Sequence, residues 1–243
     1  MREPKNTKLL KATARERLLG RMGTLLAATV LYQIIQFFIT EFVSAIVSPT
    51  NTITLVIYFV SAFLLELFFG VFVSGFAYLY LNVIYAQSIS VADIFYGFRQ
   101  NSDKALIIQI PFAIASTLLS VALSVGYYLM RIKAPGEQIS FAVAFAVLGF
   151  ILLIYLKLNF AMSFFLLHDF PERSAFDLLK TSEKVMRGYR FRLFKLYLSY
   201  IPLFLLGIIT FFVPLLWIKV YKETAFAAFY QDRMAIAATA KNN

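Results

Sequence analysis

Residues 53–81 read ITLVIYFVSAFLLELFFGVFVSGFAYLYL, a run of 29 residues in which Glu66 is the only charged side chain. A helix of about 20 apolar residues crosses the hydrocarbon core of a bilayer, so this run is long enough for a membrane span. The rest of the chain agrees, because 60% of its 243 residues are hydrophobic and only 15% are charged. Soluble domains are roughly half apolar. The sequence therefore predicts an all-α integral membrane protein.

Other segments carry the same signal at different strengths. Four more runs are as long and nearly as apolar: 25–47, 105–130, 139–167 and 193–212. A sixth, 214–235, is interrupted by Lys219, Lys222, Glu223 and Asp232. We predict a polytopic bundle of six transmembrane helices. Five helices are the alternative, in which the segment from Pro214 lies along the outer surface and the C-terminus is external.

The distribution of basic residues favours six helices with both termini in the cytoplasm. Seven Lys and Arg residues precede the first span, two lie between positions 84 and 104, and seven between 173 and 195. With Arg233 and Lys241, 18 of the 23 basic residues then face the cytoplasm, as the positive-inside rule requires. The predicted organisation is a basic cytoplasmic segment over 1–24, one transmembrane domain over 25–235 and a short cytoplasmic tail over 236–243.

A few polar residues lie inside the predicted spans. Glu66 belongs to a stripe of small and polar residues with a step of four on the second span. Lys157 and Asn159 lie about ten residues from the inner end of the fourth span. An unpaired charge at this depth costs at least ~2.5–3.5 kcal/mol, so we predict an ion pair between Glu66 and Lys157. Gln33 and Gln36 on the first span are expected to extend this polar interior.

That pair has two interpretations. Buried ionisable groups often mark conduction paths for protons or cations, whereas an acid and a base that neutralise each other can simply clamp two helices together. A possible internal repeat adds to the first interpretation, since Gly97, Lys104 and Pro111 recur 91 positions later as Gly188, Lys195 and Pro202. Such repeats are common in transporters.

The residues for catalysis are scarce. The chain has no cysteine and a single histidine, His168, so thiolate chemistry and the usual histidine metal sites or relays are excluded. It also contains no phosphate-binding loop of the Gly-x-x-x-x-Gly-Lys type and no Gly-x-Ser-x-Gly elbow. We therefore expect no enzyme activity, no cofactor and no metal. Carboxylate chemistry at the inner surface is the weakest alternative.

The last inner loop is predicted to contain an amphipathic helix at the membrane interface. Ser174 and Asp177 have the spacing of an N-terminal cap, and apolar and basic residues follow on opposite sides. The basic residues of this loop are Lys180, Lys184, Arg187, Arg190, Arg192 and Lys195. They suit anionic lipid headgroups, at ~1 kcal/mol per residue, or a membrane protein partner. A topology signal without a ligand is the alternative. Nucleic acid is not expected, because membrane orientation already explains the net charge of +10.

Several short motifs resemble those of a known family. The segments are Asp93–Phe98, Leu166–Pro171, Ser182–Arg190 and the aromatic positions around Tyr221 and Tyr230. Together they resemble an uncharacterised family of multi-pass proteins from Gram-positive bacteria, domain-of-unknown-function family nine-seven-five. The motif positions are Asp93, Gly97, Phe98, Asp169, Pro171, Gly188, Tyr221 and Tyr230. The resemblance implies a helical bundle of a bacterial plasma membrane and no activity. The chain departs from the family at 211–214, where Phe-Phe-Val-Pro replaces the usual glycines.

These observations predict a non-enzymatic accessory, scaffold or regulatory component of the plasma membrane, whose basic inner loops contact anionic lipid or a protein partner. The alternative is a small-solute or lipid transporter that uses a polar site around Glu66 and Lys157. A cavity that reaches Glu66 would favour transport. A closed bundle with a large exposed apolar or basic face would favour the accessory role. The sequence does not predict the oligomeric state.

Overall fold

The computed structural model describes residues 4–47, 51–210 and 212–241, and every regular element within them is helical. The ends of the predicted 1–24 and 236–243 segments, and Phe211 of the last turn, lie outside the described residues. The all-α prediction is confirmed. The helices are α1 (Thr7–Leu18), α2 (Met22–Ile46), α3 (Thr52–Ile84), η1 (Val91–Phe95), α4 (Tyr96–Arg99), α5 (Ser102–Arg131), α6 (Gly136–Asn159), α7 (Ser163–Asp169), α8 (Ala175–Met186), α9 (Arg190–Leu198), α10 (Ile201–Ile209) and α11 (Pro214–Lys241).

Five helical segments are long and apolar enough to cross a membrane. They are Met22–Ile46, Ile53–Ile84, Ser102–Arg131, Gly136–Asp169 and Arg190–Ile209. Each corresponds to one of the five strongly apolar runs, so the chain has the helices of a multi-pass membrane protein. The segment 214–235 is helical as part of α11 but is not among the five.

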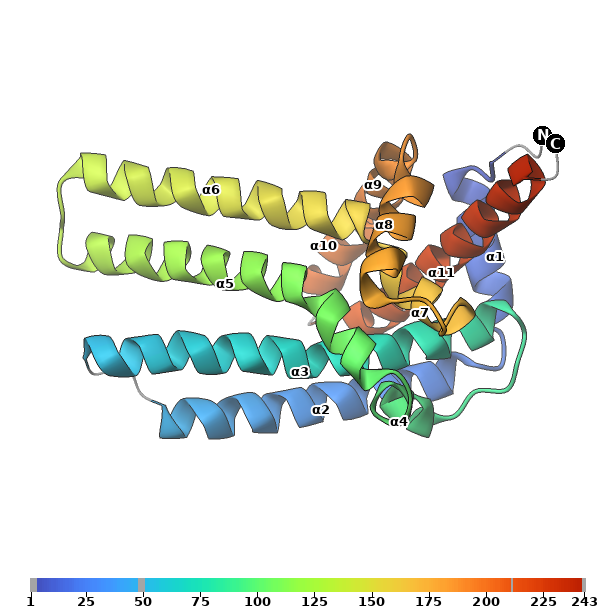
Figure 1. Cartoon of the computed structure of the whole chain (residues 1–243), viewed down its shortest axis with the longest axis horizontal. Helices are drawn as coiled ribbons and strands as arrows, with labels where there is room; N and C mark the ends of the chain where they lie inside the picture. The colour runs from blue at the N-terminus through green and yellow to red at the C-terminus, as the bar shows by residue number, and fades with distance from the viewer. Residues whose placement is uncertain (1–3, 48–50, 211, 242–243) are drawn as a thin grey trace.

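The long helices form two antiparallel hairpins that project in the same direction (Figure 1). One hairpin is α2 with α3, and the other is α5 with α6. The remaining helices gather at the opposite end, where both ends of the chain also lie (Figure 1). The backbone N–H of Lys5 donates to Asp232 Oδ2 at 3.1 Å there. The helices α10 and α11 meet well short of the far ends of the hairpins (Figure 1).

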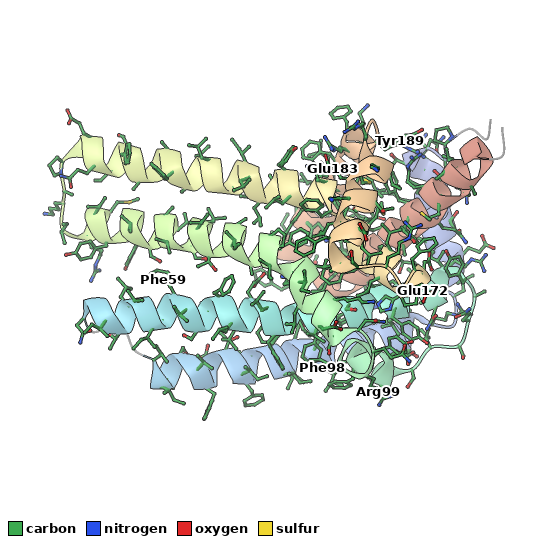
Figure 2. All side chains as sticks on the ribbon, viewed as in Figure 1. Phe59, Phe98, Arg99, Glu172, Glu183 and Tyr189 are labelled. Carbon is green, nitrogen blue, oxygen red and sulfur yellow. The ribbon has the colours of Figure 1, made fainter. Side chains whose placement is uncertain are left out.

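Burial differs sharply between the two ends of the molecule. The end formed by α1, η1, α4, α7, α8, α9 and most of α11, here called the core end, contains fully buried side chains such as Leu10, Ile84, Leu166 and Phe229. Along the projecting hairpins, large apolar side chains are exposed and point outward (Figure 2). Exposed apolar side chains on long helices are suited to lipid. The core end is instead packed like the interior of a soluble domain.

Side-chain caps fix where several helices begin. Asn6 accepts a hydrogen bond from the backbone of Leu9 at 2.9 Å and starts α1. Ser174 accepts from the backbone of Asp177 at 3.2 Å and starts α8, the helix predicted for the last inner loop. Such caps satisfy backbone donors that have no partner within the helix. The position of α8 at a membrane interface stays a prediction.

The predicted fourth span is not one continuous helix. The helix α6 ends at Asn159, and α7 begins at Ser163. Ser182 of α8 explains the break, because its hydroxyl donates to the carbonyl of Asn159 at 3.0 Å and accepts from the backbone of Met162 at 3.1 Å. Since backbone groups freed by a break must be paired when they are buried, α8 stabilises the interruption. Lys157 therefore lies in the last turn of α6 and not within one continuous helix that extends to Asp169.

The two copies of the possible repeat adopt different local structures. Gly97 lies within α4, whereas Gly188 has a φ of +80° in the turn between α8 and α9. Pro111 lies inside α5, which bends in this region (Figure 1). Pro202 instead stands in the first turn of α10, after the break from α9. The two copies share the spacing of these residues in the sequence, but their backbone conformations differ.

Candidate functional site

A central cavity of about 600 Å³ lies where the two hairpins meet the C-terminal helices. Side chains from α3, α5, α6, α7, α9, α10 and α11 line it. Its charged lining residues are Glu66, Lys157, Lys222 and Glu223. Most of the other walls are apolar and include Phe112, Phe160, Phe204 and Phe226. Ligand sites commonly combine apolar walls with a few polar groups in this way.

Glu66 is held in place from α5. The Gln109 side-chain amide donates to Glu66 Oε1 at 3.2 Å, and Gln109 itself is buried. Gly70, one helical turn after Glu66, makes this contact possible, because a Cβ atom there would lie 2.4 Å from Gln109 Cγ. Glycine is therefore required where α5 approaches α3 with a glutamine between them. Of the predicted stripe on α3, Gly70 serves this close approach, whereas the hydroxyl of Ser74 lies 3.2 Å from His168 Nε2.

The predicted ion pair between Glu66 and Lys157 is not formed in this structure. Both side chains line the central cavity, but no nitrogen–oxygen distance of 4.0 Å or less joins them. The prediction treated Lys157 as deep within a continuous span. Because α6 ends at Asn159, the ammonium group lies at the C-terminal end of a helix, where the helix dipole stabilises a cation. The side chain of Lys157 is also exposed, so the helix dipole and the longer-range attraction to Glu66 offset part of the cost of its charge, and water or a ligand is left to supply the rest.

Two further charged residues in the cavity come from α11. Lys222 Nζ lies 2.9 Å from Glu223 Oε1 and 5.4 Å from the centre of the Tyr197 ring. In the sequence these residues only weakened the sixth span, so their place in the site was missed. The available signal was the charge itself, because ionisable residues in apolar segments usually face a cavity or the bundle interior. A smaller cavity of about 260 Å³ shares Glu223 and adds Lys219 and Tyr32.

The other predicted intramembrane residues lie outside the central cavity. Gln33 and Gln36 are exposed on α2, because Tyr32 directs the opposite side of that helix toward α3, where its ring packs against Phe69, Phe72 and Phe76. They do not extend the polar interior. Asn159 is buried, and its side-chain amide donates to the Tyr155 carbonyl at 2.7 Å. Asn159 is the last residue of α6 and does not line the central cavity.

The basic residues of the last inner loop divide into two groups. Lys180, Lys184, Arg187 and Lys195 are exposed. Arg192 instead pairs with the buried carboxylate of Asp232 at 3.0 Å, and Arg190 lies 3.8 Å from Glu183. One side of α8, with Leu178, Leu179 and Met186, is buried within the protein, so other helices cover it. The opposite side is open to a partner and carries the exposed ring of Phe176 beside the basic residues.

Three of the family-motif residues join α1 and α7 to α11. Tyr230 donates to Asp169 Oδ2 at 2.5 Å and stacks on Phe165 at 5.0 Å. Tyr221 donates to the carbonyl of Lys11 at 3.2 Å and accepts from Arg15 at 3.3 Å. Burial, with a smaller contribution from Arg15, lowers the pKa of Lys11, whose ammonium group donates to the Ser199 carbonyl at 2.9 Å. These contacts tie the two ends of the chain to the core end.

The remaining motif residues shape turns and close helix contacts. Asp93 accepts from the backbone of Ser90 at 2.8 Å and caps η1. The ring of Phe98 packs on Phe72 with 4.8 Å between centres. Lys104 donates to the carbonyl of Pro171. Together with Gly97 and Gly188, these residues build the core end, and none of the eight motif residues lines the central cavity.

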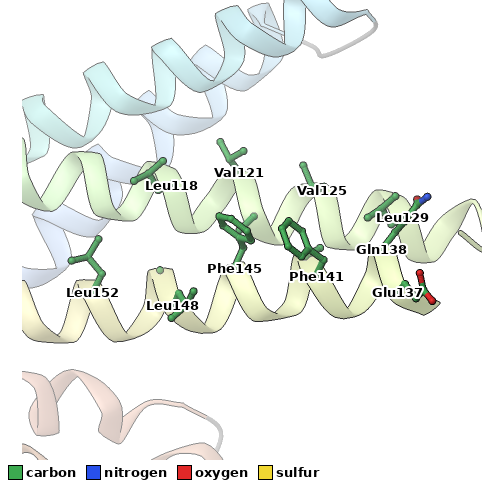
Figure 3. Close-up of a pocket in the computed structure, with 13 residues that line it drawn as sticks. Leu118, Val121, Val125, Leu129, Glu137, Gln138, Phe141, Phe145, Leu148 and Leu152 are labelled. Atoms are coloured by element: carbon green, nitrogen blue, oxygen red, sulfur yellow. The ribbon is translucent and has the colours of Figure 1, made fainter. Parts of the chain in front are cut away.

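A groove of about 900 Å³ lies between α5 and α6 on one of the hairpins. Its walls are apolar side chains such as Leu118, Phe141 and Phe145, and Glu137 and Gln138 stand at one end (Figure 3). Acyl chains of the surrounding lipid suit such walls. With no convergent polar groups along its length, this groove is not a candidate for chemistry or for selective binding.

One comparison with known proteins is informative. A family model described as "Protein of unknown function (DUF975)" matches residues 1–236. The chain belongs to this family. The match confirms the resemblance stated from the motifs and extends it to the N-terminal helix α1, which the motifs did not cover. The family description assigns no activity. No curated protein and no solved structure shows a significant match.

Proposed function

We propose that this member of the family is a transport or lipid-handling protein of the bacterial plasma membrane, which binds a small polar or amphiphilic molecule in the central cavity without chemical conversion. The observation that carries the proposal is the presence of Glu66 and Lys157 in one cavity without contact between them. The sequence offered a cavity at Glu66 as the feature that would favour transport over an accessory role.

The cost of placing charged side chains in the cavity favours the binding of a ligand there. An ionised side chain away from bulk water is costly unless a partner compensates it. Within the described residues, the Glu66 carboxylate accepts one side-chain hydrogen bond, from the neutral amide of Gln109, and Lys157 attracts it without direct contact. Because Glu66 is half-buried and the ammonium group of Lys157 is exposed, water or a bound molecule can complete the coordination of both groups. A structural clamp would instead bring the two groups into contact.

The topology that we propose has both termini in the cytoplasm. It is supported by the proximity of the described chain ends (Figure 1) and by the 18 of 23 basic residues that this orientation places inside. An even number of passages is required. The fifth and sixth passages are then the segment Arg190–Ile209 and α11, which form a third hairpin. The helix α8 then lies at the inner interface.

Single cysteines can test access to the cavity, because the native chain has none. Ser116 lines the cavity, whereas Ile114 is exposed on the outside of α5. In proteoliposomes, we expect a charged thiol reagent to modify Ser116→Cys at least about tenfold faster than Ile114→Cys, because thiolates react only where water reaches them. Equal, slow modification of both cysteines would show a closed bundle and contradict the proposal.

A second candidate function is the accessory role, which the exposed basic side of α8 favours. Lys180, Lys184 and Arg187 are free to attract anionic headgroups or an acidic partner. Extraction in native-lipid discs followed by mass spectrometry separates the two functions. A stoichiometric protein partner that is lost in the Lys180→Gln, Lys184→Gln double variant would support the accessory role, and an isolated bundle that retains lipid would support the cavity.

A further inference from the structure

The charges of the central cavity fall into two different pairs. Lys222 and Glu223 neutralise each other at 2.9 Å. Glu66 and Lys157 face the same space without forming such a contact. The formal charge of the four residues sums to zero. One carboxylate and one ammonium group therefore remain available to a ligand.

The charges of Glu66 and Lys157 favour some ligands over others according to the charge of the ligand. A ligand that is only an anion could pair with Lys157 but would add no counter-charge to the half-buried Glu66 carboxylate, which is bonded to the neutral amide of Gln109. A simple cation could pair with Glu66 but would leave the exposed ammonium group of Lys157 without an anion. A zwitterion with both an ammonium group and an acidic group satisfies both residues at once. The cavity remains electrically neutral when such a ligand binds.

The size and walls of the cavity add a requirement for apolar surface. About 600 Å³ falls within the ~300–1,000 Å³ typical of ligand pockets. Phenylalanine side chains from α5, α7, α10 and α11 supply much of the wall. A small, fully hydrated zwitterion would make no apolar contact with these walls. An amphiphile would cover them and gain the free energy of apolar burial.

We infer that the ligand class of the central cavity is a zwitterionic amphiphile, with its ammonium group at the Glu66 carboxylate and its phosphate or carboxylate at Lys157. This inference rests on the proposed function. The same chemistry is found in a phospholipid with an ethanolamine headgroup and in its water-soluble product, glycerophosphoethanolamine. The experiment must distinguish these two sources.

The test uses the full chain in proteoliposomes that contain a photoactivatable phosphatidylethanolamine or a phosphatidylglycerol with the same acyl chains. We expect the zwitterionic lipid to label cavity peptides of α5–α7 in preference to the anionic lipid. Glu66→Gln should lower the ratio of the two labelling yields about tenfold, the size of effect expected when a charged hydrogen bond is lost. Lys157→Gln should weaken labelling by both lipids. Glu137→Gln, the same change outside the cavity at an exposed position, should leave the ratio unchanged.

The second arm tests the soluble source. Protection of Ser116→Cys from the thiol reagent by glycerophosphoethanolamine, with no labelling of cavity peptides by either lipid, would support a zwitterion taken from water. Preference for phosphatidylglycerol, or a lipid ratio unaffected by Glu66→Gln, would overturn the inference. So would labelling by neither lipid without protection by the soluble compound. These failures would leave the proposed function standing if Ser116→Cys still reacts, whereas an unreactive Ser116→Cys would count against the cavity itself.

Discussion

At the scale of single residues, glycines determine how closely the short helices η1 and α4 approach α3. A Cβ atom on Gly97 would lie 2.3 Å from the Val71 carbonyl oxygen, and one on Gly75 would lie 2.0 Å from the Ile94 carbonyl oxygen. Backbone cannot yield as a flexible side chain can, so Gly97→Ala should destabilise the protein by about 1–3 kcal/mol. We expect its thermal unfolding midpoint to fall by about 3–10 °C in detergent. Gly23→Ala is the control, since nothing lies within 4 Å of that site.

The hydrogen bond between Tyr230 and Asp169 is the second residue-scale feature that can be tested. Tyr230 is fully buried, and its hydroxyl approaches Asp169 Oδ2 to 2.5 Å. Tyr230→Phe preserves the stacking on Phe165 but removes the donor to a carboxylate, so we expect a loss of about 1–3 kcal/mol in the free energy of unfolding. Tyr128→Phe, an exposed position on α5, should have no effect. A stable Tyr230→Phe variant would show that this contact does not hold α7 on α11.

Prediction from sequence succeeded for residue types at this scale and failed for contacts. The motif residues were identified from the sequence, but their contacts were not. Asp169 and Tyr230, for example, are 61 positions apart in the sequence, and hydrophobic periodicity carries no information about which distant residues pair. Glu66 and Lys157 both line the central cavity, but the predicted ion pair between them is not formed. Their separation across a cavity depends on the end of α6, which hydropathy does not show.

At the scale of elements, the break between α6 and α7 is the main departure from the predicted spans. The apolar character of 139–167 continues through the break, so hydropathy averaged over a window predicts one helix. The interruption exists because Ser182 on α8, buried and 20 or more residues away, pairs with backbone groups on both sides of it. Tertiary contacts of this kind override local propensity.

This explanation predicts the effect of removing the Ser182 hydroxyl. Ser182→Ala leaves the backbone N–H of Met162 and the carbonyl of Asn159 without the partner they have at 3.1 and 3.0 Å. Each buried polar group left unpaired costs about 1–3 kcal/mol. We expect a fall of about 4 °C or more in the unfolding midpoint. Ser140→Ala is a suitable control, because Ser140 is exposed and bonds only within its own helix. An unchanged midpoint would mean that α8 does not maintain the break.

At the scale of the whole molecule, the structure separates a lipid-facing part from a packed core end. Composition predicted the first part well, since long apolar helices are recognisable one at a time. The core end was not foreseen, because α1, α7, α8 and α11 become buried through contacts with one another and with α3 and α5. The central cavity lies where these two parts meet, and it is bounded by seven helices drawn from most of the chain. No local pattern could have outlined it.

The side of the membrane on which α11 ends distinguishes six passages from the five-helix alternative, and a single introduced cysteine can report it because the native sequence has none. Ala238 is exposed near the end of α11. If α11 is the sixth passage and the C-terminus is cytoplasmic, an impermeant thiol reagent should modify Ala238→Cys only after the cells are opened. If α11 lies along the outer surface, the same cysteine faces external water and should react in intact cells. Strong modification of Ala238→Cys in intact cells would therefore refute six passages with a cytoplasmic C-terminus, because the basic tail after α11 would then be outside the membrane as well.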